Sequence, residues 1–271
     1  MAWNFDGKVV LVTGGAAGVG AGLVRELLAR NARHVAFLDI AEREGAILEN
    51  ELLNKFGALR AKFIKCDIAD ERQLSEAFKQ VLEKYRRLDV VVNNAGIAGD
   101  NDTLCTTMID VNFRGTVTST LKALSIMRAD VGGSGGAVLN VSSLHAFKPA
   151  SYLSVYSATK AAVLQFSNFL ANEESYSATK VRIITVCLGP TDTALLHKRN
   201  LNNFAKDAHE LNSGTSEPQR VESAVNGIIE VIHQAENGST WMIANNKAAR
   251  DVTTKVNQSL KMLSEITDDI V

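Results

Sequence analysis

Short apolar segments recur along the chain at intervals that suit strands alternating with helices. Most of them are continuous and rich in β-branched residues, which is typical of strands buried on both faces. The predicted strands are Val9–Thr13, Val35–Asp39, Phe63–Asp67, Val90–Asn93, Ala137–Ser142, Val181–Val186 and a last one near Thr240–Ile243. Between them, apolar residues at helical spacing predict helices over Gly20–Ala29, Ala41–Phe56, Glu71–Tyr85, Leu104–Met127 and Val155–Leu170.

Strands that alternate with crossover helices form mainly parallel, doubly wound sheets. We therefore predict an α/β fold with a Rossmann-like sheet of about seven strands, in the order 3-2-1-4-5-6-7, and helices on both faces. A ligand is expected in the crevice at the carboxyl ends of the strands. Residues 1–271 suit a single domain. Residues 191–219 predict a small substrate lobe, and the weakly helical tail at about 244–271 is a candidate to pack on a neighbouring subunit.

Composition and charge exclude several classes of protein. The net charge of −1 attracts neither nucleic acid nor an anionic membrane. No apolar run approaches the roughly 20 residues of a membrane span, and the first residues do not predict a signal peptide. Cys66, Cys105 and Cys187 have no CxxC or metal-like spacing, so we expect reduced thiols, no metal site and a cytoplasmic protein.

A glycine-rich turn, Thr13–Gly20, follows the first strand. Glycine permits a tight turn and a close approach of a pyrophosphate to the backbone. The N-terminus of the next helix offers free N–H groups and the positive end of its dipole. The turn therefore predicts a dinucleotide site that includes Gly14, Gly18, Val19 and Gly20; a glycine-rich turn without a ligand is the alternative.

Asp39 ends the second strand, 19 residues beyond Gly20. A carboxylate at this place can bind the adenine ribose hydroxyls and repels a 2′-phosphate, so it favours NAD over NADP. The alternative role for Asp39 is a helix cap. Asp67, with Ile68, is placed to contact adenine or to cap the helix that begins near Glu71. Asn94, Ala95 and Gly96 could line the adenosine side, although the Asn93 and Asn94 amides could instead join strands.

Tyr156 and Lys160 are four residues apart and share one face of a predicted helix, 13 residues after Ser143. The lysine ammonium and an oxidised nicotinamide both favour phenolate, which predicts a lowered tyrosine pKa and a general base. Ser143 can hold the substrate oxygen while hydride leaves the carbinol carbon. The same five residues recur at Tyr176–Lys180, where no helix is predicted, and Tyr152 is expected in the pocket wall.

These motifs, Thr13-Gly-x-x-x-Gly18-x-Gly20, Asn93-Asn94-Ala95-Gly96, Ser143 and Tyr156-x-x-x-Lys160, resemble the short-chain dehydrogenase/reductase family from Lys8 to about Ile243. The resemblance implies an NAD-dependent enzyme, with Asn112 as a fourth catalytic residue that kinks its helix and holds a water bound to Lys160. It also implies that Gly189, Thr191 and Thr193 bind the cofactor, with Thr193 at the nicotinamide carboxamide. Relatives pair through helices that correspond to 104–127 and 155–170, which implies a homodimer or homotetramer.

The chain is most similar in pattern to insect-type alcohol dehydrogenases and NAD-dependent hydroxyprostaglandin dehydrogenases. Pro190 follows Gly189 where the family has Pro-Gly, and Leu153 replaces a glutamine of the hydroxyprostaglandin enzymes, which argues against prostaglandin. Ser143, His145, Leu153 and Tyr156 are the expected substrate contacts. Leu144, Phe147, Leu195 and Leu196 suggest an apolar secondary alcohol or ketone, such as a lipid, steroid-like or terpenoid molecule. The alternatives are a small secondary alcohol or a non-catalytic nucleotide-binding relative.

Overall fold

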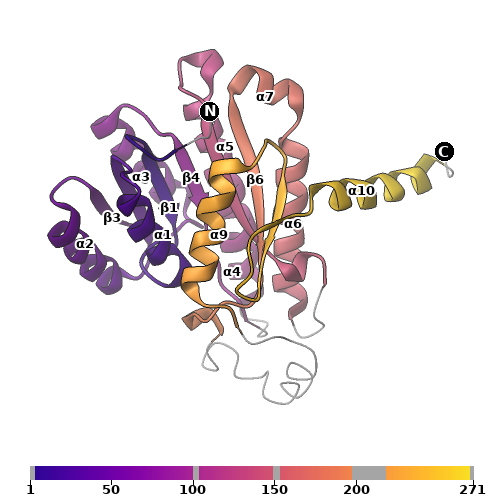
Figure 1. The fold of residues 1–271 in the computed structure, drawn as a ribbon, viewed down its shortest axis with the longest axis horizontal. Coiled ribbons are helices and arrows are strands. Elements are labelled where there is room, and N and C mark those ends of the chain that lie inside the picture. Colours follow the sequence, from indigo (N-terminus) through magenta and orange to yellow (C-terminus); the bar gives the residue numbers. More distant parts are fainter. Residues whose placement is uncertain (1–3, 100–103, 149–152, 197–217, 269–271) are drawn as a thin grey trace.

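One eight-stranded sheet forms the centre of the protein (Figure 1). The computed structural model describes residues 4–99, 104–148, 153–196 and 218–268. The strand order is β3-β2-β1-β4-β5-β6-β7-β8, so the predicted order of the first seven is confirmed. These seven are parallel, whereas β8 runs antiparallel to β7. The strands are β1 Val9–Thr13, β2 His34–Asp39, β3 Ala61–Lys65, β4 Val90–Asn93, β5 Gly136–Ser143, β6 Val181–Leu188, β7 Thr240–Ile243 and β8 Arg250–Asp251.

Helices cover both faces of this sheet. In the described residues the helices are α1 Gly18–Ala29, α2 Glu42–Phe56, α3 Glu71–Tyr85, α4 Cys105–Met108, the π-helical turn η2 Ile109–Gly115, α5 Thr116–Met127, α6 Ser154–Leu170, α7 Glu173–Thr179, α9 Val221–Gln234 and α10 Thr253–Asp268. Short 3₁₀ turns lie at η3 Ala129–Val131, η4 Leu144–Ala146 and η6 Ala194–Leu196.

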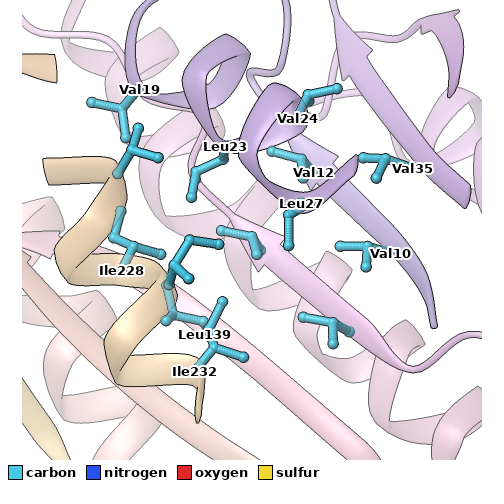
Figure 2. Packing of buried hydrophobic residues seen from close by; sticks show 14 of the residues in the cluster. Val10, Val12, Val19, Leu23, Val24, Leu27, Val35, Leu139, Ile228 and Ile232 are labelled. Carbon is cyan, nitrogen blue, oxygen red and sulfur yellow. The ribbon is translucent and has the colours of Figure 1, made fainter. Parts of the chain in front are cut away.

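The alternation of side chains along each strand divides the core into two apolar layers. In β1, Val10 and Val12 point to the layer under α1 and α9, while Val9 and Leu11 point to the layer under α3 and α5. Figure 2 shows the first layer, where Leu23 and Leu27 of α1 and Ile228 and Ile232 of α9 pack on the same face of the sheet. Burial on both faces explains why the strands are continuous apolar runs rather than alternating ones.

Several predicted boundaries are wrong. The third strand ends at Lys65, so Asp67 lies in the loop beyond it. The helix predicted over 104–127 is divided by the π-helical turn η2. The prediction also lacks α9, although its apolar residues recur at helical spacing, and lacks β8, whose two residues are too few to produce a pattern.

The C-terminal tail is more ordered than predicted. After β8, α10 runs for 16 residues and extends away from the sheet (Figure 1, yellow). Met262, Leu263 and Ile266 on this helix are each more than half exposed. Packing of the tail on a neighbouring subunit stays a prediction.

The second Tyr-Ser-Ala-Thr-Lys copy lies on a helix, contrary to the prediction. Tyr176 belongs to α7, and Lys180 follows at its C-cap with its Nζ 5.9 Å from the Tyr176 ring centroid. This pair immediately precedes β6 and therefore lies at the amino end of the parallel sheet. Position in the sheet, rather than the lack of a helix, separates this copy from Tyr156.

A buried histidine is expected to make the fold acid-sensitive. His34 is 1% exposed, stacks on Tyr85 and lies 2.8 Å (Nδ1) from the Leu59 carbonyl oxygen. Burial lowers the pKa of His34 to about 4, so the unfolded chain binds a proton that the folded protein excludes. The free energy of unfolding should therefore fall as the pH drops from 6.5 to 4, by up to about 3 kcal/mol.

Urea unfolding of wild type and His34→Leu at several pH values would check this, because the variant should lose that part of the pH dependence. An equal slope in both proteins would contradict it.

Candidate active site

The glycine-rich turn joins β1 to α1 at the carboxyl edge of the sheet. Gly14 and Gly18 have φ angles of 64° and 51°, which favour glycine. A Cβ on Gly20 would lie 1.9 Å from the Gly14 carbonyl oxygen, and one on Gly14 would lie 2.7 Å from Ala95 Cα. Ala17, the N-cap of α1, has no side chain that can cap the helix, so the first N–H groups of α1 are available to an anion.

Asp39 is tied to this turn. One carboxylate oxygen accepts a hydrogen bond from the Ala16 N–H and the other from the Ala41 N–H, each at 3.0 Å. The second bond reaches Ala41, which is itself the N-cap residue of α2 and has no side-chain cap, so the capping alternative for Asp39 is wrong. The carboxylate lies half-buried beside the glycine turn, where it can face a bound adenosine.

Asp67 and Ile68 lie in the loop that leads from β3 to α3. The Asp67 carboxylate accepts a bond of 2.9 Å from the Ala69 N–H, whereas the N-cap of α3 is Asp70. The capping alternative for Asp67 is therefore wrong. Ile68 is 6% exposed and belongs to an apolar core layer, so its side chain is occupied with packing.

The asparagine amides at the end of β4 join strands. Asn94 Nδ2 donates to the carbonyl oxygens of Thr13 and Gly14, both at 3.1 Å, and the Ala95 N–H donates to Thr13 Oγ1. Asn93 donates to Asn140 and Thr120 in a buried network that continues to Ser167. The strand-joining alternative for both asparagines thus fits their side chains. The sequence does not reveal this network, because its four residues lie on four elements that are far apart in the chain.

The structure brings Tyr156, Lys160 and Ser143 together. Ser143 ends β5, and Tyr156 and Lys160 lie one turn apart on α6, all three less than 9% exposed. The Ser143 hydroxyl lies beside Tyr156, close enough to lower the pKa of its phenol, and Lys160 Nζ lies 5.8 Å from the Tyr156 ring centroid. Lys160 also donates to the Val141 carbonyl oxygen at 3.0 Å, which anchors its side chain on β5.

Burial has the largest effect on the pKa values of Tyr156 and Lys160. It raises the pKa of Tyr156 above its usual value, and the bond from Ser143 lowers it only in part. The predicted lowering by the lysine ammonium is therefore wrong for the protein alone, because desolvation of the phenolate outweighs it. The same burial lowers the pKa of Lys160 to about 8.

Asn112 lies within the π-helical turn η2, where the resemblance places a kink. Its Oδ1 accepts a bond of 2.8 Å from the Ile97 N–H, and its Nδ2 donates to the Ile97 carbonyl oxygen and to Thr159 Oγ1. A Cβ on Gly96 would lie 3.3 Å from both Asn112 Oδ1 and Lys160 Nζ. Gly96 thus leaves a narrow space between the asparagine and the lysine. A π-turn inside a long helix is often found at a functional site.

An apolar cluster borders Tyr156. Leu153 is 8% exposed and packs with Met108 and Tyr156, next to Ile97 and Leu104. Met108 was predicted only as helix packing. The His145 ring meets the Tyr156 ring edge-on at 6.0 Å, and its Nδ1 lies 3.3 Å from the Lys148 carbonyl oxygen. Tyr152 and the Leu196 side chain lie outside the described residues.

The segment after β6 lies against the glycine turn. Thr193 Cγ2 would be 3.1 Å from a Cβ on Gly18. Thr191 is 7% exposed and donates to the Gly189 carbonyl oxygen at 3.0 Å. Thr193 therefore lies against the glycine turn, whereas the binding of the cofactor by Gly189, Thr191 and Thr193 stays a prediction. Most of the predicted lobe, residues 197–217, lies outside the described residues.

The sequence of this chain is similar to those of known proteins. A family described as short chain dehydrogenase matches residues 8–203. Over 254 residues the chain is 31% identical to 15-hydroxyprostaglandin dehydrogenase [NAD(+)] of Macaca fascicularis, covering 90% of this chain and 93% of that one. It is 28% identical to alcohol dehydrogenase 2 of Ceratitis cosyra, covering 93% and 97%.

Solved structures agree on the fold. Levodione reductase superposes with a TM-score of 0.77 at 22% identity, covering 89% of this chain and 97% of that one. A 3-ketoacyl-(acyl-carrier-protein) reductase from Brucella melitensis, complexed with NADH, gives 0.74 at 22% identity, covering 88% and 97%. The relatives favour the enzymatic prediction over the non-catalytic alternative. The chain is an oxidoreductase that belongs to the short-chain dehydrogenase family.

Proposed function

We propose that the protein interconverts a secondary alcohol and a ketone with NAD(H), using Tyr156 as the general acid and base. The observation that supports this most is the buried contact of Tyr156 with Ser143 and Lys160 at the end of β5, on the same sheet edge as the glycine turn. The bound dinucleotide supplies the acceptor or donor of hydride. The residues of this chain bind it, hold the substrate and move the proton.

Each of the three residues has a separate task. Ser143 donates to the substrate oxygen and holds it beside the Tyr156 hydroxyl. Tyr156 takes the hydroxyl proton as the carbinol carbon loses hydride, and it returns a proton in the reverse direction. The positive charge of Lys160 stabilises the phenolate, while Asn112 and Gly96 lie next to its Nζ, where a water can relay the proton to solvent.

We infer that NAD is preferred to NADP. The Asp39 carboxylate lies beside the glycine turn, and a 2′-phosphate placed near it would meet a like charge. The relatives named 15-hydroxyprostaglandin dehydrogenase [NAD(+)] carry the same cofactor in their name. Glycine-turn N–H groups would hold the pyrophosphate, and Thr191 and Thr193 the nicotinamide end.

The substrate proposed is apolar near the carbinol carbon. Leu153 and Met108 form an apolar wall against Tyr156, which disfavours a strongly polar group there. Initial rates of NAD⁺ reduction with secondary alcohols of increasing apolar size test this proposal. We expect kcat/KM to rise with size, by about tenfold for each 1.4 kcal/mol of added burial. The highest kcat/KM with the smallest alcohol would favour the small-alcohol alternative instead.

We also propose that the whole chain acts as one catalytic unit that assembles into a dimer or tetramer. Ile109 of η2, Leu121 of α5 and Phe169 of α6 are 48%, 46% and 70% exposed. Sedimentation at micromolar concentration should give a dimer or tetramer, and Leu121→Glu with Phe169→Glu should shift it toward monomer. A wild-type monomer would contradict this assembly.

A cytoplasmic location is proposed from the cysteines alone. Cys66 and Cys187 are buried free thiols, and Cys105 is a half-buried one. Among the described residues, no helix is both long enough and apolar enough to cross a membrane.

A further inference from the structure

Gln219 joins two distant parts of the chain immediately before α9. It is 0% exposed. Its N–H donates to the Pro190 carbonyl oxygen at 2.8 Å, and its own carbonyl oxygen accepts from the Asp192 N–H at 2.9 Å. These bonds form a parallel bridge between Thr191 and Gln219, which are 28 residues apart. The backbone of Gln219 therefore fixes the segment that leaves β6.

The side chain of Gln219 adds a second connection. Its Nε2 donates to Thr191 Oγ1 and to the Ile243 carbonyl oxygen at the end of β7, both at 3.1 Å. Its Oε1 has no hydrogen-bond partner among the described residues. Burying an amide with one atom unsatisfied costs stability, and an apolar side chain of similar size would avoid that cost. Packing alone therefore does not account for a glutamine at this position, whereas its hydrogen bond to Thr191 does.

A short chain of contacts leads from Gln219 to the glycine turn. Thr191 Oγ1, which accepts from Gln219, donates to the Gly189 carbonyl oxygen. Thr193 Oγ1 donates to the Thr191 carbonyl oxygen at 3.3 Å, and the Thr193 methyl group would lie 3.1 Å from a Cβ on Gly18. The orientation of Thr193 over Gly18 thus depends on a loop whose centre is held by Gln219.

We propose that Gln219 is a positioning residue for the nicotinamide half of the cofactor, acting through Thr191 on the loop 189–193. This inference rests on the proposed function, which places that loop at the nicotinamide. Gln219 itself need not touch the cofactor. It holds Thr191 and Thr193 where they can bind the nicotinamide, so that little binding energy is spent on ordering them.

The test compares two ligands that differ only at the nicotinamide. Gln219→Met keeps the length of the side chain and removes the bonds to Thr191 and Ile243. We expect the Kd for NADH to rise about tenfold and the Kd for ADP-ribose to stay within about twofold. Gln234→Met, at the exposed C-terminal end of α9, is the matched control and should change neither Kd.

Thr191→Val breaks the same bond from its other partner and keeps the test decisive if Gln219→Met does not fold. It should raise the NADH Kd similarly, and the double variant should add little to either single change. An unchanged NADH Kd, or an equal loss for NADH and ADP-ribose, would overturn the positioning role. A wild type that binds neither ligand would overturn the proposed function, and this inference with it.

Discussion

Tyr156→Phe is expected to lower kcat about a thousandfold while the Kd for NADH stays within about twofold. The phenyl ring keeps the packing against Leu153 and Met108. The hydroxyl beside Ser143 is lost, and with it the group that accepts the substrate proton. General acid–base catalysis by one positioned side chain contributes about 10²- to 10⁴-fold. Steady-state rates and an NADH fluorescence titration of the same preparation measure both quantities.

The chain carries its own control for this substitution. Tyr176→Phe changes the same residue of an identical pentapeptide, on α7 at the opposite edge of the sheet. This variant should keep the wild-type kcat. Full activity in Tyr156→Phe, or an equal loss in both variants, would show that Tyr156 is not the acid–base group.

Lys160→Met should reduce kcat by at least a hundredfold and, at neutral pH, make the fold more stable. The ammonium is 4% exposed, and burial lowers its pKa to about 8 from 10.5. That shift corresponds to a cost of about 3 kcal/mol when the buried group is charged. Loss of the bond to the Val141 carbonyl oxygen destabilises the variant by about 1 kcal/mol. We therefore expect the free energy of unfolding to rise by a net amount of about 2 kcal/mol.

The pH dependence separates this effect from general packing. The unfolded chain binds the Lys160 proton up to pH 10.5, whereas the folded protein releases it near pH 8. The gain in the free energy of unfolding of Lys160→Met over wild type is therefore complete below pH 8 and disappears as the pH rises to 10.5. Denaturant unfolding at several pH values measures it. Lys180→Met, at an exposed position of the second pentapeptide, should change neither activity nor stability. An equal gain in stability for both variants would refute this account of Lys160.

The order of the sheet and the position of the catalytic group could be predicted because they depend on local patterns. Continuous apolar strands alternating with helices allow few topologies. Glycine at Gly14, Gly18 and Gly20 is required by backbone geometry, so the turn is visible in the sequence. The spacing of Tyr156 and Lys160 requires only one helical turn.

Most other features of the site could not be predicted, because they depend on contacts between residues that are far apart in the sequence. No local pattern indicates that Asn93 reaches Asn140. The Asp70-x-x-Gln73 capping pattern, by contrast, is local and does indicate Asp70 rather than Asp67 as the cap of α3. The Tyr156 pKa could not be predicted because its largest cause is burial by the whole fold. Gln219 looks like an ordinary polar residue until its bonds to residues 28 and 24 positions away are seen.

The most direct test of the central claim is the reduction of NAD⁺ and of NADP⁺ by the purified protein with a panel of secondary alcohols of increasing apolar size. Appearance of NADH, with kcat/KM for NAD⁺ at least about tenfold above that for NADP⁺, is the predicted result, because the Asp39 carboxylate repels a 2′-phosphate. Equal or faster reduction of NADP⁺ would contradict the role of Asp39. Reduction of neither nucleotide across the whole panel of alcohols, and oxidation of neither NADH nor NADPH with the matching ketones, would contradict the proposed function itself.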